Sequence, residues 1–268
     1  MEPMIRVENL VKRYAARGLG GRAAAFTAVD SVSFSILPGR TLALVGQSGS
    51  GKSSVALCLA CLERATSGAI WFGRRNIAAL SERQLRAVRP EMQLVFQDPS
   101  SSLNPRWSVE EIVLEPLFVQ RRIASPERRK QVAQALERVG LGADYLQRKP
   151  AELSGGQRQR VAIARALILE PKLLILDEVL SALDCSIQAQ IANLLVDLQR
   201  ALGLAYLFIT HDLKMAAYLA DEIAVMSRGR IVEQGVAEKI VQSPERAETR
   251  ALLGDTLLDQ SMEAAHKP

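Results

Sequence analysis

Long apolar runs and cysteines are both scarce in this sequence, and each absence excludes a class of protein. The longest apolar run, residues 55–62, is far too short for a transmembrane helix, which needs about 20 apolar residues. The first residues, MEPMIRVENLVKRY, carry charges where a signal peptide needs an apolar stretch, so we expect no export. Three cysteines are too few for a disulfide framework and favour a reducing cytoplasm.

The cysteines do not indicate a metal site either. Cys58 and Cys61 have the spacing of metal ligands, but they lack a second pair and fall on a helical pattern. We interpret them as buried thiols, and Cys185 as a packing residue.

The chain is basic, with a net charge of +5, which can indicate a nucleic acid or an anionic membrane as partner. Its one tight basic cluster, RRIASPERRK at residues 121–130, has no aromatic residues between the charges, which argues against single-stranded nucleic acid. We interpret the cluster as the solvated start of a helix, with Ser125 as N-cap and Pro126 in the first turn. We therefore expect no nucleic-acid partner.

Apolar patterns predict an α/β fold with two kinds of strand. Residues 31–37, SVSFSIL, alternate serine with apolar side chains, as in a half-buried antiparallel strand. The later runs TLALV, MQLVF, KLLIL and AYLFI do not alternate and are separated by helical patterns, as expected of parallel strands covered on both faces. Residues 15–28 are predicted to form a loop without a chemical role, and residues 97–149 to be helical and free of strands.

The sequence GQSGSGKS after TLALV matches the phosphate-binding pattern G-x-x-x-x-G-K-[ST], placed between a strand and a helix. The glycines let successive backbone N–H groups turn toward a β-phosphate. Lys52 would supply charge to the β- and γ-phosphates, and the Ser53 hydroxyl would coordinate Mg²⁺. The predicted nucleotide-binding residues of this loop are Gly46, Gln47, Ser48, Gly49, Ser50, Gly51, Lys52, Ser53 and Ser54.

Polar residues follow three other apolar runs. Asp177 and Glu178 follow LLIL, and we expect Asp177 to hold Mg²⁺ and Glu178 to act as general base on an attacking water, although such a pair can also be a surface cap. Gln97 follows MQLVF and His211 follows AYLFIT. In doubly wound sheets ligands lie at the carboxyl ends of the strands, so these ends can meet at one γ-phosphate, although a lone histidine is more often structural.

A second anion-binding pattern occurs in ELSGGQRQR at residues 152–160, where a serine and two glycines precede a predicted helix. One nucleotide needs only one such cradle. The residues by themselves leave the purpose of the second cradle open.

The series GQSGSGKS, Gln97, LSGGQ, LLILDE, SALD and THD, in this order, closely resembles the ATP-binding subunits of ABC transporters. The resemblance covers residues 14–235 and implies that two such domains pack head to tail, with one ATP between the phosphate loop of one and the LSGGQ of the other. Ser154 and Gly156 would then bind a γ-phosphate lying on Lys52 of the opposite domain, and Gly155 and Gln157 would be further nucleotide-binding residues.

The same resemblance assigns further roles. Tyr14 would stack on adenine, Gln97 would sense the γ-phosphate and Mg²⁺, and Asp184 would cross the dimer. His211 would contact the γ-phosphate. The family usually has proline after the catalytic glutamate, and here we expect Val179 to loosen that turn without abolishing hydrolysis.

The resemblance further implies an α/β P-loop NTPase core with a mixed sheet, an N-terminal antiparallel β subdomain and an inserted helical lobe. We predict an ATP-binding domain at residues 1–240, with its core at 1–96 and 166–240 and its lobe at 97–165. Residues 241–268 are a short C-terminal extension.

Two segments resemble the dipeptide, oligopeptide and nickel importer branch, namely VFQDPSSSLNPRWSVEEIVLEPL and SALDCSIQAQI. Longer members of that branch bind an iron–sulfur cluster through C-terminal cysteines. Because no cysteine follows Gly235, we predict no cluster here. The cofactors implied are ATP and Mg²⁺.

The implied partners are a second ATP-binding subunit, identical or related, two transmembrane permease subunits and indirectly a substrate-binding protein. The chain would lie peripherally on the cytoplasmic face of the inner membrane. We expect exposed Leu103, Trp107, Val109 and Ile112, beside a turn at residues 104–105, to form a docking groove for the permease. The alternative is that Trp107 and Ile112 only fill the core of the lobe.

Other classes of function remain as alternatives. A soluble ABC protein of DNA repair or translation would carry a long coiled coil or two ATP domains, and this chain has one phosphate loop and no sustained heptads. An exporter subunit is often fused to membrane helices. A lone P-loop NTPase or kinase would lack LSGGQ.

Overall fold

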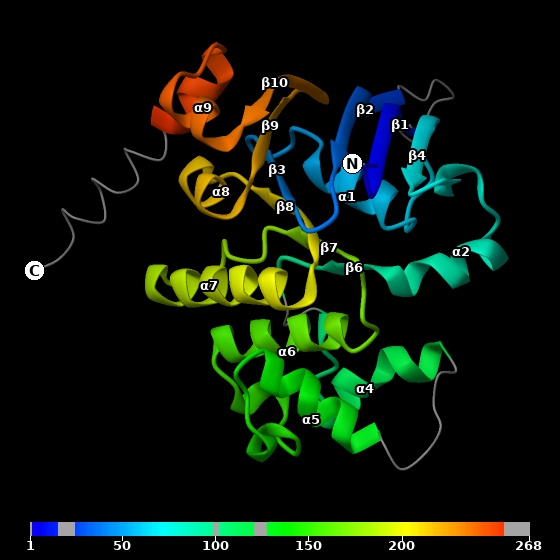
Figure 1. Ribbon diagram of the computed structural model, residues 1–268, viewed down its shortest axis with the longest axis vertical. Coiled ribbons are helices and arrows are strands. Elements are labelled where there is room, and N and C mark those ends of the chain that lie inside the picture. Colours follow the sequence, from blue (N-terminus) through cyan, green and yellow to red (C-terminus); the bar gives the residue numbers. More distant parts are fainter. Residues whose placement is uncertain (1, 16–24, 99–101, 121–127, 255–268) are drawn as a thin grey trace, which may run out of the picture. The chain divides into compact units, whose positions relative to one another are not determined.

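The computed structural model describes residues 2–15, 25–98, 102–120 and 128–254. The chain divides into two compact units, which we call unit 1 (Met1–Ser81 and Tyr206–Pro268) and unit 2 (Glu82–Ala205). Figure 1 shows the elements of both units coloured along the sequence. Each unit is described by itself.

Unit 1 contains an antiparallel sheet built from the N-terminal part of the chain. Its strand order is β2-β1-β4-β5, and β1, β2 and β4 lie side by side in Figure 1. The predicted alternation is confirmed, since Val32, Phe34 and Ile36 are buried and the serines between them are exposed. The strands are β1 (Ile5–Ala15), β2 (Ala25–Ile36), β4 (Ser67–Phe72) and β5 (Arg75–Asn76), followed by the short 3-10 helix η1 (Ile77–Ala79).

A second group of strands in unit 1 runs in the order β10-β9-β3-β8. Strand β3 is parallel to both β8 and β9, whereas β9 and β10 are antiparallel, so the strands are mixed as predicted. The bounds are β3 (Thr41–Val45), β8 (Ala205–Thr210), β9 (Glu222–Ser227) and β10 (Arg230–Val236). The accompanying helices are α1 (Lys52–Leu59), α8 (Leu213–Leu219) and α9 (Ala237–Gln242).

Unit 2 combines a pair of parallel strands with helices. Strands β6 (Met92–Val95) and β7 (Leu173–Asp177) pair in parallel, and helix α6 packs against α4 and α5. Helix α4 begins at a capping box in which Ser108 and Glu111 exchange hydrogen bonds. The helices are α2 (Glu82–Val88), α4 (Val109–Val119), α5 (Arg128–Arg138), α6 (Gly155–Leu167) and α7 (Cys185–Leu202), with 3-10 turns η2 (Arg89–Glu91), η4 (Ala143–Tyr145) and η5 (Pro150–Glu152).

The helical character predicted for residues 97–149 is confirmed, because the described residues in this range contain no strand. The division into units 1 and 2 rests on compactness, and unit 2 joins β6 and β7 to the helices. The boundaries predicted for the core, the lobe and the C-terminal extension stay predictions. The predicted helix cap at Ser125 and Pro126 lies outside the described residues.

The expectation of an exposed apolar groove around residue 109 is wrong in its main residues. Leu103, Val109 and Ile112 are buried, and Val109 has no exposed surface at all. Trp107 is half-buried. The apolar side chains at the start of α4 fill the interior of unit 2, because α6 packs on α4.

Two smaller expectations also need correction. Residues 25–28, assigned to a loop, are the first part of β2, because they pair with β1. Of the cysteines, Cys58 is buried as expected, but Cys61 is only half-buried and Cys185 is exposed at the start of α7 rather than packed. Among the described residues, no helix combines the length and the apolar character that a membrane span requires.

Candidate functional site

The loop at residues 46–51 leads from β3 directly into α1, as the sequence pattern predicts. Gly51 is the N-cap of α1, with a left-handed φ of 106°, and no side chain caps this helix end. The first turn of α1 contains no acidic residue. The N–H groups at a helix start carry partial positive charge and need acceptors, so this helix start is suited to an anion.

Close packing explains the glycines at both ends of this loop. A Cβ atom on Gly51 would lie 2.2 Å from the carbonyl oxygen of Ala28 in β2, and one on Gly46 would lie 2.2 Å from that of Met226 in β9. Any side chain at these positions would collide with backbone. The loop therefore packs closely against β2 at Gly51 and against β9 at Gly46.

Lys52 lies inside this loop, with 4% of its surface exposed. Its Nζ donates hydrogen bonds to the carbonyl oxygens of Gly46 (2.6 Å) and Gln47 (3.1 Å). The buried Ser50 hydroxyl in the same loop has no hydrogen-bond partner among the described residues. Burying an ammonium group and an unpaired hydroxyl is costly, so the loop fits a negatively charged ligand with acceptor oxygens.

Tyr14, at the end of β1, lies beside the first turn of α1. Its hydroxyl is 3.2 Å from the hydroxyl of Ser54, and the Nζ of Lys12 is 4.7 Å from the centre of its ring. Lys12 in turn forms an ion pair of 2.8 Å with Glu63. Burial and a hydrogen bond with Glu63 raise the pKa of Tyr14 above its usual value. A single network therefore fixes the aromatic ring next to the phosphate-binding loop.

His211 and the loop lie at the same edge of their strands. Val45 and Thr210 are register partners in the parallel pair of β3 and β8. The residues that follow them, Gly46 and His211, therefore leave the sheet side by side, as predicted from the strand ends. The His211 side chain is exposed, and α8 begins just after it with Asp212 as N-cap.

The corresponding arrangement in unit 2 concerns Gln97 and Glu178. Val95 and Leu176 are register partners, so Gln97 and Glu178, each two residues further on, follow the same ends of β6 and β7. The Nε2 of Gln97 donates to the hydroxyl of Ser181 (3.2 Å), and that hydroxyl donates to the carbonyl oxygen of Glu178 (2.9 Å). Glu178 has a left-handed φ of 49°, which is uncommon for a residue with a side chain and often marks functional sites.

Asp177, Val179 and Asp184 surround this turn. Asp177 is the last residue of β7 and is half-buried, and Val179 is fully buried. Asp184 is the exposed N-cap of α7, and its side chain makes no capping hydrogen bond. The predicted loosening of the turn by Val179 stays a prediction.

The LSGGQ segment forms the start of α6, as the sequence predicts. Ser154 and Gln157 form a capping box, in which the Gln157 N–H donates to the Ser154 hydroxyl and the Ser154 N–H donates to the Gln157 side chain. Ser154 itself is exposed. A Cβ on Gly156 would lie only 2.6 Å from a methyl carbon of Ile187 in α7, so this glycine is required for close packing of α6 on α7.

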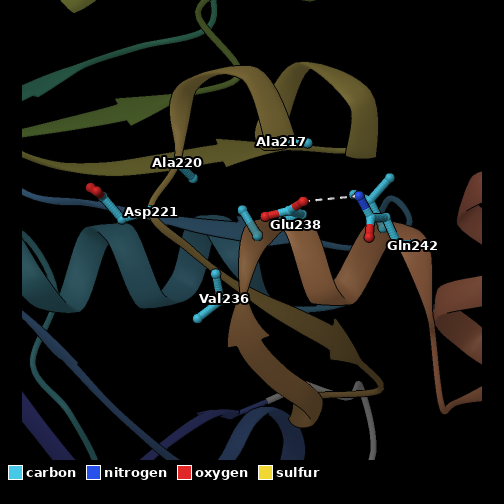
Figure 2. Close-up of a pocket in the computed structure, with 8 residues that line it drawn as sticks. Ala217, Ala220, Asp221, Val236, Glu238 and Gln242 are labelled. Carbon is cyan, nitrogen blue, oxygen red and sulfur yellow. Dashed lines mark hydrogen bonds between the residues drawn. The ribbon is translucent and has the colours of Figure 1, made fainter.

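A pocket of about 400 Å³ in unit 1 is a different kind of feature. Figure 2 shows it between α8, the end of β10 and α9, with a hydrogen bond from Gln242 to Glu238. Small apolar side chains and the carboxylates of Asp221 and Glu238 line it. Carboxylates repel phosphates, so this pocket is not a nucleotide site.

The structure thus groups the predicted residues within each unit. Unit 1 holds Tyr14, the loop from Gly46 to Ser54 and His211, and unit 2 holds Gln97, Asp177, Glu178, Asp184 and the LSGGQ residues. One aromatic residue was missed, Phe26, which pairs with Tyr14 across β1 and β2. The small residues around it led to the assignment of a loop, and the alternation of burial in β2 becomes visible only from Ser31 onward.

Comparisons with known proteins identify relatives of this chain. The family described as ABC transporter matches residues 29–181. The glutathione import ATP-binding protein GsiA of Escherichia coli K12 is 47% identical over 254 residues, which cover 94% of this chain and 41% of that protein. The chain therefore spans about two fifths of the length of GsiA.

Other relatives match over more of their length. The di/tripeptide transport ATP-binding protein DppF of Pseudomonas aeruginosa is 43% identical, over 96% of this chain and 80% of its own. Two solved structures are each 30% identical. The dimeric ATP-binding cassette MJ0796, bound to ADP and Pi, has a TM-score of 0.77 over 87% of this chain and 99% of its own. CbiO1 from Clostridium perfringens, part of the complex cbiONQ, has a TM-score of 0.78 over 98% of this chain and 100% of its own.

Proposed function

This chain belongs to the ABC transporter family, and we propose that it is the ATP-hydrolysing subunit of an importer for small peptides. The observation that carries the ATP-binding part is the buried Lys52, held in a loop whose end glycines admit no side chain. The names of GsiA and DppF, a glutathione import and a di/tripeptide transport protein, support peptides as cargo. They favour peptides over nickel, the other cargo that the sequence suggested.

We assign nucleotide binding to the loop and to Tyr14. The backbone N–H groups at the start of α1 and the Lys52 ammonium bind the phosphates, because both are positively polarised and fixed in place. Tyr14 contacts the adenine, since its hydroxyl is tied to Ser54 in the first turn of α1. His211 follows the strand next to the loop and contacts the γ-phosphate.

The hydrolytic residues are assigned to unit 2. Glu178 takes a proton from the attacking water, and the left-handed backbone at Glu178 sets the direction of its carboxylate. Gln97 positions the water or the phosphate while its Nε2 remains bonded to Ser181. We assign Mg²⁺ binding to the carboxylate of Asp177, the hydroxyl of Ser53 and the side-chain oxygen of Gln97, because Mg²⁺ prefers oxygen ligands. When bound, Mg²⁺ would neutralise part of the phosphate charge.

We further propose that ATP joins two ATP-binding subunits head to tail, either two copies of this chain or this chain and a related one. Ser154, Gly155, Gly156 and Gln157 then receive the γ-phosphate held by the opposite subunit. The exposure of Ser154 at a helix start supports this role. Asp184, also exposed and without a capping bond, lies in the same unit and is assigned to the contact between subunits.

Coupling to the membrane is assigned to the segment before α4. Two permease subunits and, indirectly, a substrate-binding protein complete the transporter, with this chain peripheral on the cytoplasmic face. The corrected docking surface comprises the exposed residues Asn104, Pro105 and Arg106 with the half-buried Trp107. A hydrogen bond from the Arg106 N–H to the Asn104 side chain (3.0 Å) fixes this turn.

The proposal is tested by ATPase and association measurements on the purified chain, with and without the products of neighbouring genes. We expect Mg²⁺-dependent hydrolysis, loss of ATP binding in Lys52→Ala, and an ATP-dependent dimer in size-exclusion chromatography of a hydrolysis-deficient variant. Vesicles containing the full transporter should take up dipeptides rather than nickel ions. A chain that neither binds nor hydrolyses ATP would contradict the proposal.

A further inference from the structure

Phe26 is unusual among the apolar residues of β2. Its side chain is 62% exposed, whereas Val29, Val32, Phe34 and Ile36 in the same strand are buried. Exposing a large aromatic ring leaves favourable burial energy unused. An exposed ring beside a binding loop is therefore a candidate for ligand contact.

The register of β1 and β2 places Phe26 directly opposite Tyr14. Side chains that are directly opposite each other on antiparallel strands point to the same face of the sheet, with Cβ atoms about 5 Å apart. The rings of Phe26 and Tyr14 are thus neighbours on one surface. Tyr14 is only half-buried, so this surface is accessible.

The phosphate-binding loop lies beside this part of β2. The carbonyl oxygen of Ala28, two residues along the strand from Phe26, would be 2.2 Å from a Cβ on Gly51. Residues two apart in a strand are about 7 Å apart. Phe26 therefore lies about 7 Å along β2 from the point where β2 contacts the loop.

Lys12 restricts which face of the Tyr14 ring can stack on a base. Its Nζ lies 4.7 Å from the ring centre, and its ion pair with Glu63 and a hydrogen bond to the carbonyl oxygen of Arg64 (3.0 Å) hold it there. One face of the Tyr14 ring is therefore already in contact with a cation. A base must use the remaining face, and an adjacent ring would enlarge the available stacking area.

From these observations we infer that Phe26 and Tyr14 together form a two-ring platform for the adenine of ATP. The inference rests on the proposed function and adds Phe26 as a determinant of base recognition. Aromatic side chains stack on any base through its π-face, and purines offer the largest area. Phe26 contributes affinity for the base and none for the phosphates.

The test compares binding of ATP with binding of inorganic tripolyphosphate, which has the phosphates without the base. Both are measured on the full chain by competition against a fluorescent ATP analogue. We expect Phe26→Ala to weaken ATP binding about tenfold, within the range known for base–aromatic stacking, and to leave tripolyphosphate binding unchanged. Phe26→Tyr, which keeps the ring, should bind ATP like the unmodified chain.

Controls separate this inference from the proposed function. Phe118→Ala removes another exposed phenylalanine, on α4, and should change neither ligand's binding. If Phe26→Ala binds ATP normally while Tyr14→Ala and Lys52→Ala do not, the platform is wrong and the ATP site stands. Equal weakening of ATP and tripolyphosphate would also overturn it, because Phe26 would then act through the loop. If the unmodified chain does not bind ATP, the proposed function itself fails.

Discussion

The side chain of Gln97 is tied to the backbone of Glu178 through one hydroxyl group. The Gln97 Nε2 donates to the Ser181 Oγ at 3.2 Å, and this Oγ donates to the Glu178 carbonyl oxygen at 2.9 Å. The link joins the end of β6 to the turn that holds the proposed general base. A displacement of Gln97 would therefore shift the backbone of Glu178, which carries the proposed general base.

Removing the linking hydroxyl should slow hydrolysis without weakening nucleotide binding. In Ser181→Ala we expect kcat to fall about threefold to tenfold, the scale of one net hydrogen bond, with an unchanged Kd for ATP. Steady-state ATPase and equilibrium binding measure the two quantities. Ser181→Thr keeps a hydroxyl and should retain most of the rate, and a full rate in Ser181→Ala would show that the link has no part in hydrolysis.

Loss of the proposed base should separate binding from turnover. Glu178→Gln should bind ATP normally but hydrolyse it about 10²-fold more slowly or worse, because an amide cannot accept the proton. Rapid-quench or coupled ATPase assays measure this. Glu137→Gln, an exposed glutamate on α5, serves as the matched control and should be fully active. Turnover at the normal rate in Glu178→Gln would remove Glu178 from the mechanism.

Replacing each of the two adjacent glycines of LSGGQ by alanine should affect the stability of the protein differently. Gly156→Ala places a methyl group 2.6 Å from Ile187, whereas Gly155→Ala places one 3.5 Å from Leu183, an ordinary contact. We expect Gly156→Ala to lower the free energy of unfolding by about 1–3 kcal/mol, as overpacking does, and Gly155→Ala to change it little.

Urea denaturation measures both changes. Adding Ile187→Ala should recover part of the loss in Gly156→Ala by removing the clashing methyl carbon. Equal stability of Gly155→Ala and Gly156→Ala would mean that α6 and α7 pack less closely than described.

A glutamate introduced near the start of α4 should lower protein stability at a buried position and should lower transport at an exposed one. Val109→Glu buries a carboxylate without a partner and should destabilise the protein by about 3 kcal/mol or more. Arg106→Glu, on the exposed turn, should leave thermal unfolding unchanged but reduce transport in reconstituted vesicles. Normal transport by Arg106→Glu would place the permease contact elsewhere.

The residues that follow α9 include a further helical stretch at residues 247–254, and Glu233 should make this stretch sensitive to acid. Its carboxylate accepts hydrogen bonds from the Thr249 hydroxyl and from the N–H groups of Glu245 (2.8 Å) and Arg246 (3.1 Å). Burial alone would raise the pKa of Glu233, but these hydrogen bonds hold this pKa below its usual value.

A lowered carboxylate pKa stabilises the folded state above the ordinary glutamate pKa of about 4.3, and this stabilisation is lost as the pH falls through the folded value. The protection factors of residues 245–254, which are exchange rates corrected for the intrinsic effect of pH, should therefore be high at neutral pH and fall only as the pH drops below about 4.3, the ordinary glutamate pKa. Glu233→Gln should exchange faster already at neutral pH and lose this dependence. An unchanged exchange rate in Glu233→Gln would show that the carboxylate does not hold the helix.

Local patterns in the sequence were sufficient for the buried parallel strands β3, β6, β7 and β8 and for the phosphate loop. TLALV is β3, and its loop enters α1 at Lys52, because a buried parallel strand and a glycine-rich turn each need particular residues at particular spacings. The parallel direction of β6 and β7 likewise follows from short apolar runs separated by helices, whereas their pairing with each other comes from the structure. Ser154 as a helix cap could be read from its spacing to Gln157.

Burial at residue 109 and the pairing at residue 26 were decided only by the tertiary structure. An apolar residue near a turn is equally consistent with a docking surface and with a core, and only the packing of α6 on α4 places Val109 inside. Phe26 stands among small residues without alternation, and only the register with β1 brings it opposite Tyr14. The sequence by itself determined which residues can bind phosphate, since that chemistry is local. Which apolar side chains remain at the surface depends on contacts between distant segments, and only the folded chain decides those.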